Sequence, residues 1–453
     1  MAVHQLPKLT TRVRFPSPAP ILHHLFHFPL EFFSGGATLP NIILYARRLF
    51  MMIRYLLIVL TFVSAAVLTA QTQQEIDVRV GWDKRVNDTL LFRGITGDHE
   101  LNKAIAKDLQ NCGWFDLVNS GVSNYILTGS ASGGMVRLQL ANGAGEKIAD
   151  ISASGSDTTR ISHKAVDALL KYLYKIPGIC SSKIVFTAQT RPMQKEIYLC
   201  DYDGNNIRQL TRNGGLSLDP VWTPGGKTVI YSFVGRTYTS LVELNWNTGA
   251  NRSLVRFSGL NAGGRVSPDG RKIALVLSKD NQVDLYVRNL DGGPLKRLTN
   301  DKAVEASPCW SPDGSRICYV SDAGYSRRPR LRIISANGGA STAVRGLLGS
   351  ESVSPSWGKD GKITYSAKLG NYSVAVIDPD NRPVPRGSKQ KFGRIVEYSG
   401  DWESPSWAPD GRHVVCSCNY GIYIVDTWGA NRPRKILSGK SHLSLPNWSG
   451  ILY

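Results

Sequence analysis

Histidines are the first candidates for catalytic or metal-binding chemistry. Four occur after residue 71, at His99, His163, His413 and His442, and each falls in a separate predicted element. His99-Glu100 lacks the second histidine that a helical zinc motif requires, so His99 is expected at an exposed helix start and the other three in structural roles. No Gly-x-Ser-x-Gly nucleophile turn and no Gly-x4-Gly-Lys phosphate loop occurs. We therefore expect no catalytic residue, no metal and no cofactor.

The seven cysteines do not form a disulfide-rich pattern in a chain of 453 residues. Cys309 and Cys318 flank one predicted turn and could approach each other, whereas Cys416 and Cys418 point to the same face of one strand. In an exported chain an odd count leaves at least one cysteine unpaired. The sequence alone does not favour a particular bridge.

A turn related to Trp-Ser-Pro-Asp-Gly recurs along the second half of the chain. In this turn Pro presets φ, Asp can bond nearby amides, and Gly tolerates positive φ. The position before the turn is about 41–50 residues from its next occurrence, which is the period of propeller blades. We expect its tryptophans to pack between blades. The position is occupied by Trp222, Val266, Trp310, Trp357, Trp407 and Trp448.

Each turn is followed by two apolar strand patterns and a short outer strand, so each repeat predicts a four-stranded blade. The first repeat, from Lys183, lacks an innermost strand, and the last, Pro446-Asn447-Trp448, supplies only that strand. Joined, they complete a ring without open sheet edges. The sequence predicts a mainly β protein, with a six-bladed β-propeller over residues 181–453 that the C-terminal strand closes.

Charged residues gather in the predicted loops at one mouth of this ring. Loops entering the innermost strands carry an acidic set: Asp219, Asp301, Glu305, Glu351, Asp401 and Glu403. Loops between the second and third strands carry a basic set: Arg191, Lys195, Arg236, Lys279, Arg327, Arg328, Arg330 and Lys368. We expect an acidic collar with a basic rim that docks a partner, the rim steering encounter. Merely solvated loop charges are the alternative.

A different pattern precedes the propeller. Residues 99–112 and 157–175 place apolar side chains on one helical face, and three strands are expected at 125–128, 135–140 and 147–152. Glu75 to Val80 alternates as a strand would. Residues 72–180 therefore predict a small α/β domain.

Composition limits the remaining choices. Lys and Arg number 54 against 35 Asp and Glu, a net charge of +19, and beyond residue 71 the excess lies in the propeller region. Such a field favours acidic partners, anionic glycans or membrane surfaces; a solvated basic surface without a partner is the alternative. Only one stretch is apolar enough to enter a bilayer, which excludes a polytopic membrane protein.

That stretch, at residues 51–70, has the layout of a secretory signal peptide: Arg54, then about a dozen apolar residues, then small residues. Cleavage after Ala70 is expected, and an uncleaved anchor is the alternative. A signal peptide at residues 51–70 could not act if residues 1–50 preceded it. We therefore expect translation to start at Met51 or Met52, and a disordered extension over residues 1–50 is the alternative. Export to the periplasm follows.

The order of these parts resembles the TolB family, the periplasmic β-propeller proteins of the Tol–Pal system. The resemblance is carried by Gln74 to Val80, by the junction from His163-Lys164 through Gly178-Ile179 to Phe186, and by the Trp-Ser-Pro-Asp-Gly blades. It implies a non-enzymatic scaffold that supports envelope integrity and cell division.

The resemblance also implies partners. A Pal-like outer-membrane lipoprotein would dock on the propeller, and a TolA-like inner-membrane protein would contact the N-terminal segment. That segment comprises Glu75, Ile76, Asp77, Val78, Arg79 and Val80. We expect a monomer, no nucleic-acid partner and peripheral membrane association at most. The alternative is a propeller-type polysaccharide lyase or another periplasmic glycan-binding propeller.

Overall fold

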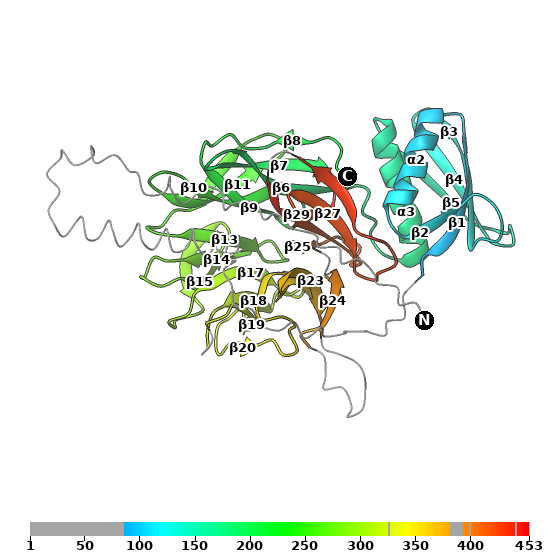
Figure 1. The fold of residues 1–453 in the computed structure, drawn as a ribbon. Coiled ribbons are helices and arrows are strands. Elements are labelled where there is room, and N and C mark those ends of the chain that lie inside the picture. The colour runs from blue at the N-terminus through cyan, green and yellow to red at the C-terminus, as the bar shows by residue number, and fades with distance from the viewer. Residues whose placement is uncertain (1–85, 325–326, 381–392, 398–399, 440–441, 453) are drawn as a thin grey trace, which may run out of the picture. The chain divides into compact units, whose positions relative to one another are not determined.

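The computed structural model describes residues 86–324, 327–380, 393–397, 400–439 and 442–452 (Figure 1). The expected extension at 1–50, the signal peptide at 51–70 and the segment Glu75–Val80 lie outside the described residues. Within the described residues, no helix combines the length and apolar character needed to cross a membrane. The fold is mainly β, as the sequence predicts.

The first domain is a five-stranded sheet with two helices. Strand order is β2-β1-β3-β4-β5, with β1 parallel to β2 and β3 and the other pairs antiparallel. Both helices pack on one face of this sheet. Its elements are β1 (Asp88–Thr96), α2 (His99–Asn111), β2 (Phe115–Val118), β3 (Tyr125–Ser132), β4 (Met135–Asn142), β5 (Lys147–Ser154) and α3 (Thr158–Tyr174).

Local sequence explains where both helices begin. Asp98 caps α2 by accepting from the Leu101 amide at 3.0 Å, and Asp157 caps α3 by accepting from the Arg160 amide at 2.9 Å. The apolar face predicted for α2 is buried at Leu101, Ile105 and Leu109. The two predicted helices are therefore present with their expected faces inward.

The remaining 24 strands form six groups of four, which we number as blades. A single parallel pair, Lys195 with Leu216, connects blade 1 to blade 6. Blade 1 comprises β9 (Leu216–Trp222), β10 (Thr228–Val234), β11 (Thr239–Asn245) and β12 (Asn251–Val255). Blade 2 comprises β13 (Asn261–Val266), β14 (Lys272–Leu277), β15 (Asp284–Asn289) and β16 (Gly292–Arg297). Blade 3 comprises β17 (Glu305–Trp310), β18 (Arg316–Ser321), β19 (Arg330–Ser335) and β20 (Thr342–Ala343).

The other three blades follow the same order from the innermost strand outward. Blade 4 comprises β21 (Ser352–Trp357), β22 (Ile363–Leu369), β23 (Asn371–Ile377) and β24 (Gly393–Glu397). Blade 5 comprises β25 (Trp402–Trp407), β26 (His413–Cys418), β27 (Gly421–Asp426) and β28 (Arg434–Ser438). Blade 6 comprises β29 (Leu443–Ile451), β6 (Ser182–Arg191), β7 (Gln194–Asp201) and β8 (Arg208–Gln209).

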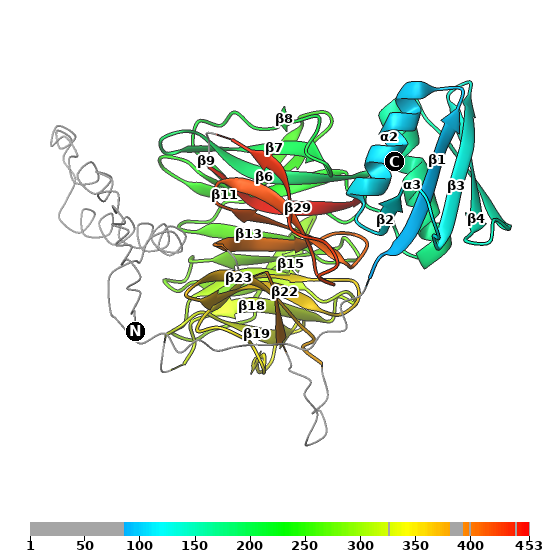
Figure 2. The same cartoon turned by 45° about the vertical axis from the view of Figure 1, so that its right-hand side comes forward.

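Blade 6 is assembled from the two ends of the propeller sequence. Figure 2 shows β29 in red beside β6 in green, and the two strands pair antiparallel, with Trp448 opposite Ile184. The Trp448 indole donates to the Ser182 hydroxyl at 2.7 Å, and the Asn447 side chain accepts from the Trp222 amide at 2.9 Å. The last strand thus contacts both the start of the ring and blade 1.

Tryptophans of the repeated turn pack between neighbouring blades, as predicted. Trp310 of blade 3 lies in one apolar cluster with Leu285 and Val287 of blade 2, and Trp407 of blade 5 lies with Val374 and Val376 of blade 4. Replacing such a buried ring by alanine typically lowers the free energy of unfolding by about 3–5 kcal/mol. These contacts join the blades without backbone pairing.

Each innermost strand contains a bulge that the sequence analysis did not predict. The pairing register shifts between the first and last parts of the strand in all six blades. In each blade the residue three positions before the last residue ahead of the repeated turn (tryptophan, or Val266 in blade 2) has positive φ, which a bulge accommodates. These residues are Asp219 (54°), Gly263 (66°), Ser307 (47°), Ser354 (52°), Ser404 (52°) and Leu445 (53°).

Candidate functional site

The first domain is fixed to blade 5 through a buried charged cluster. The Arg412 guanidinium packs against both Trp114 and Trp428, at 4.8 and 4.5 Å from their ring centroids, and the two rings contact each other edge to face with centroids 5.1 Å apart. It donates to both carboxylate oxygens of Asp426, at 3.0 and 2.7 Å. The Trp114 indole donates to Asp410 at 3.0 Å. Trp114 belongs to the first domain and the other residues to blade 5, so this cluster joins the two.

Two of the four histidines are also buried in paired positions. His413 Nδ1 lies 2.6 Å from Asp410, and His163 Nε2 lies 3.5 Å from Asp108. Burial is the largest single influence and raises the pKa of Asp410, but the charge and hydrogen bonds of His413, together with the Arg412 amide, outweigh it and lower the pKa to about 2. Both histidines are therefore engaged in structural pairs.

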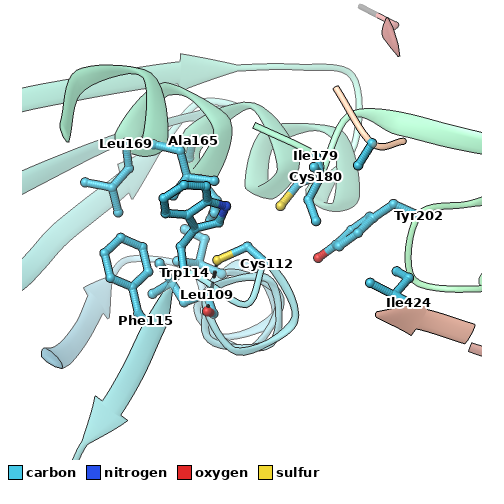
Figure 3. Close-up of a cluster of buried hydrophobic side chains, with 14 of the residues drawn as sticks. Leu109, Cys112, Trp114, Phe115, Ala165, Leu169, Ile179, Cys180, Tyr202 and Ile424 are labelled. Carbon is cyan, nitrogen blue, oxygen red and sulfur yellow. Dashed lines mark hydrogen bonds between the residues drawn. The ribbon is translucent and has the colours of Figure 1, made fainter. Parts of the chain in front are cut away.

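Apolar residues complete the contact between the two domains. Figure 3 shows Cys112 and Trp114 of the first domain in the same cluster as Tyr202 and Ile424 of the propeller. The Tyr202 hydroxyl donates to Asp108 at 2.7 Å. All of these propeller residues come from strands or turns at one end of blades 5 and 6.

The propeller consequently has two different ends. We call the turn face the end that carries the Ser-Pro-Asp-Gly turns and the turns between third and fourth strands. The entry face is the opposite end, where loops lead into each innermost strand and hairpins join second to third strands. Because strands within a blade alternate in direction, these two kinds of loop must lie at the same end. The first domain occupies part of the turn face, at Asp410 and Trp428.

Three predicted acidic residues gather at the entry face around Tyr372 of blade 4. The Tyr372 hydroxyl donates to Glu351 at 2.8 Å, and its amide donates to Asp401 at 2.9 Å. Burial raises the pKa of Glu403 to about 7, Asp401 acts in the same direction, and Lys368 and Lys195 oppose them. Acidic collar and basic rim residues therefore do meet here, between blades 4, 5 and 6.

Glu305 occupies a different position from the one expected. It begins β17, is only 1% exposed, and accepts from the Ser321 hydroxyl at 3.2 Å. Burial, followed by repulsion from Asp301, raises the pKa of Glu305 to about 8. Its Oε2 atom has no hydrogen-bond partner among the described residues, which suits a protonated carboxyl. The expected position in the loop before the strand is wrong for Glu305, because β17 starts earlier than the motif suggests.

We expect the buried Glu305 carboxyl to make stability fall as pH rises. Its ordinary pKa is 4.5 and its folded pKa is about 8, so the folded state retains a proton that the unfolded state releases. Between these values the free energy of unfolding should decrease by up to about 1.4 kcal/mol per pH unit. Urea unfolding of Glu305→Gln at pH 5 to 8 should show a weaker decrease. Glu146→Gln, at an exposed turn, is the control, and an identical pH slope in Glu305→Gln and wild type would contradict this assignment.

Asp219 also differs from its expected placement. It lies within β9 at the bulge rather than in the loop before it, and its carboxylate is held by Arg265 of blade 2 through bonds of 3.0 and 2.8 Å. Glu403 likewise lies within a strand, β25. The bulge explains both corrections, because it extends each innermost strand toward the entry face. Asp301 and Asp401 are exposed, and Glu351 is half-buried.

The predicted basic rim divides into tied and exposed side chains. Arg330 begins β19 and donates to the Gly349 and Leu347 carbonyls, while Arg327 donates to the Lys302 carbonyl at 3.1 Å. Lys279 pairs with neighbouring Asp280. Exposed rim residues that remain at hairpins of the entry face are Arg191, Arg236 and Arg328.

Exposed apolar side chains on the entry face were missed by the sequence analysis. Met193 and Tyr420 are 63% and 62% exposed at the tips of the β6–β7 and β26–β27 hairpins, and Leu369 is 51% exposed at the end of β22. Tyr238 and Phe257 are also exposed, in loops of the same face. The sequence held only part of the signal: large apolar residues stand where turn residues are normally small or polar, but their exposure depends on what the rest of the fold covers. We call Met193, Tyr238, Phe257, Leu369 and Tyr420 the apolar set.

Comparison with known proteins identifies the family of this propeller. Residues 170–452, more than half of the chain, match the family described as "TolB beta propeller domain". The chain belongs to the TolB β-propeller family. The crystal structure of TolB from Acinetobacter baumannii has the same fold, with a TM-score of 0.71 and 22% identity over 81% of this chain and 97% of that one.

Curated TolB relatives match over a shorter region. "Tol-Pal system protein TolB" of Anaeromyxobacter dehalogenans strain 2CP-1 is 30% identical over 161 residues, which are 35% of this chain and 36% of the relative. The same name and coverage apply to a relative from Anaeromyxobacter sp. strain K. The matching region thus spans about a third of the length of these relatives.

Proposed function

We propose that this TolB-family chain is a non-enzymatic, protein-binding scaffold of a Tol–Pal system in the periplasm. Family membership and the relatives named "Tol-Pal system protein TolB" support the system. The apparent signal peptide in residues 51–70 supports export. In this function the protein would connect partners that maintain the envelope and constrict it during division.

The observation that carries the proposal is the composition of the entry face. Five exposed apolar side chains lie in its loops, and three of them, Leu369, Tyr420 and Met193, belong to blades 4, 5 and 6, which also carry the charged group around Tyr372. Protein interfaces combine buried apolar or aromatic contacts with a polar rim. Met193, Leu369 and Tyr420 are exposed to water on this face. Covering them with a partner would lower the free energy by about 25 cal/mol per Å2 of apolar area buried.

The same face offers charges for orientation. Lys195 is half-buried beside Glu403, and Lys368 lies 4.4 Å from the ring centroid of Tyr372. Arg191, Arg236 and Arg328 are more exposed and would steer encounter rather than hold the bound state. The proposed partner for this face is a Pal-like outer-membrane lipoprotein. Asp301, Glu351 and Asp401 would contribute to the contact, whereas Glu305 and Asp219 would support it from within the strands.

The proposed second contact uses the N-terminal segment Glu75 to Val80. Its alternation of charged and apolar residues suits an extended strand that pairs with another chain. The proposed partner is a TolA-like inner-membrane protein. A segment and a face that belong to different parts of the chain could bind two partners, which is the property a hub requires.

Replacing Leu369 and Tyr420 with aspartate tests the entry face. The double variant should weaken binding of the soluble domain of a Pal-like lipoprotein at least 30-fold, roughly 2 kcal/mol, because each charge must be buried in the interface. Binding is measured by calorimetry, with circular dichroism as a check of folding.

Ile207→Asp is the matched control for this experiment. Ile207 is 58% exposed and lies in the turn between β7 and β8 on the turn face. It should leave affinity within about twofold of wild type. Equal affinity of the double variant and wild type would refute docking on the entry face, and equal losses in both variants would indicate a non-specific effect of added charge.

A further inference from the structure

Two cysteines of blade 3 face each other across one strand pair. Cys309 of β17 and Cys318 of β18 are direct partners in the antiparallel register. Directly opposed residues have side chains on the same side of the sheet and Cα atoms about 4.5–5.5 Å apart. A disulfide requires about 4.4–6.8 Å between Cα atoms. The backbone therefore already holds these residues within bridging range.

No other cysteine pair shows this arrangement in the described part of the chain. Cys416 and Cys418 occupy one strand, β26, two positions apart, so their Cα–Cβ bonds are nearly parallel and about 6.6 Å apart. Cys112 is directed to the Leu109 carbonyl at 3.2 Å, and Cys180 lies with Tyr202 in the core between the domains. Cys200 of β7 is opposite Ile184. Among the seven cysteines, Cys309 and Cys318 are thus the two that the described strand registers place opposite each other.

We propose that Cys309 and Cys318 form a cross-strand disulfide that closes the β17–β18 hairpin when the chain folds in an oxidising compartment. This rests on the proposed export of the protein, because such bonds persist mainly outside the cytosol. The oxidant is a disulfide, either that of an oxidised dithiol protein or glutathione disulfide.

The exchange balances in two steps. One cysteine thiolate attacks a sulfur of the oxidant disulfide, which forms a mixed disulfide and expels one thiolate. The second cysteine thiolate then attacks its partner's sulfur, which forms the Cys309–Cys318 bond and releases the second oxidant sulfur as a thiolate. Two protein thiols lose two electrons and two protons in total, and the oxidant disulfide is reduced to two thiols.

Burial determines when this exchange can occur. Cys309 is 8% exposed and Cys318 is fully buried. Burial, and secondarily the adjacent Cys309 thiol, raises the pKa of Cys318 well above its usual value, so little thiolate exists in the folded blade. The bond must therefore form before blade 3 packs against its neighbours. Protein that has folded in the reduced form should resist oxidation.

Trypsin provides a direct readout, because it cleaves after Lys302, Arg316 and Arg327 and so separates the two cysteines into peptides 303–316 and 317–327. The mature chain is unfolded, reduced and refolded with reduced and oxidised glutathione, then alkylated in denaturant and digested. The expected result is five alkylated cysteines and one pair of peptides joined through Cys309 and Cys318. Seven alkylated cysteines, or a bridge elsewhere, would overturn the proposal.

Two variants act as controls. Cys416→Ser should keep the bridge and leave four alkylated cysteines, whereas Cys309→Ser should lose it and leave all six remaining cysteines alkylated. Cys318→Ser provides the same comparison if the first variant fails to refold. Because refolding in glutathione does not involve export or partners, a missing bridge here refutes the cysteine pairing alone. Normal bridging together with absent lipoprotein binding would instead count against the proposed function.

Discussion

Replacement of Arg412 by methionine is expected to lower the free energy of unfolding by about 3–5 kcal/mol. Arg412 is 1% exposed and neutralises Asp426, which is 3% exposed. Its removal would leave a buried carboxylate without its cation and would leave a cavity beside the contacting rings of Trp114 and Trp428. Urea unfolding at pH 7, followed by tryptophan fluorescence and circular dichroism, measures the loss.

Arg316→Met is a matched control for Arg412→Met. Arg316 also binds a carboxylate with two bonds, to Asp380 at 2.6 and 2.7 Å, and also lies over a tryptophan, Trp357. It differs in being accessible to solvent, so its loss should cost about 1 kcal/mol or less. Equal losses in the two variants would contradict the role assigned to burial.

A double variant separates charge from packing at the same place. Arg412→Met combined with Asp426→Asn removes both charges but keeps a side-chain oxygen that can accept from the Trp428 amide, so it should recover part of the stability lost in Arg412→Met alone. The single variant should also weaken the attachment of the first domain to blade 5. Resolved unfolding of the two domains in that variant would report this directly.

The second large effect is expected at the seam of the ring. Trp448→Ala should reduce the free energy of unfolding by about 3–5 kcal/mol, because the indole is 5% exposed in β29 and donates to Ser182 at 2.7 Å. Its loss creates a cavity between blade 6 and its neighbour and weakens the pairing of β29 with β6. The unfolding midpoint in urea and the thermal midpoint both measure it.

Trp246→Ala is the corresponding control. Trp246 is half-buried just beyond β11, on the outer part of blade 1, where its indole donates to the Gly226 carbonyl at 2.8 Å. The same chemical change should cost clearly less there, about 1–2 kcal/mol. A loss in Trp448→Ala no larger than in Trp246→Ala would show that the seam contributes nothing special to stability.

Several features of this fold could be predicted because they depend on local chemistry that repeats. The Ser-Pro-Asp-Gly turns and the spacing of Trp222, Trp310 and Trp407 indicated both the blades and the packing of the rings between them. The helices were predictable because Asp98 and Asp157 precede periodic apolar faces. These signals lie within a few residues of the elements they specify.

Features that depend on distant residues were not predictable. The ion pair between Asp219 and Arg265 joins different blades across 46 positions, and nothing near either residue indicates it. β1, Asp88–Thr96, was missed because its alternation is weak and it is paired on both sides. The bulges were missed because only blade 2 has a glycine, Gly263, at the bulge position, and in the other five blades serine, aspartate or leucine gives no sign of positive φ.

The candidate site also combines features that could be predicted from the sequence with features that could not. Sequence placed Glu351, Asp401 and Glu403 at one end of the ring, and the structure brings them together around Tyr372. Sequence could not tell that Glu305 would be buried, because one residue of strand extension decides between exposure and burial. It also overlooked Met193 and Tyr420, since exposure of an apolar residue depends on what the rest of the fold leaves uncovered.

The pairing of β29 with β6 has a consequence for biogenesis. The Lys183 amide donates to the Ser449 hydroxyl, 266 positions away, so the edge of β6 stays unpaired while almost all of the propeller is synthesised. Such high contact order slows folding and leaves an unpaired strand edge that can pair with neighbouring chains. A chaperone that shields extended segments would therefore be most needed by this molecule shortly before β29 becomes available for pairing.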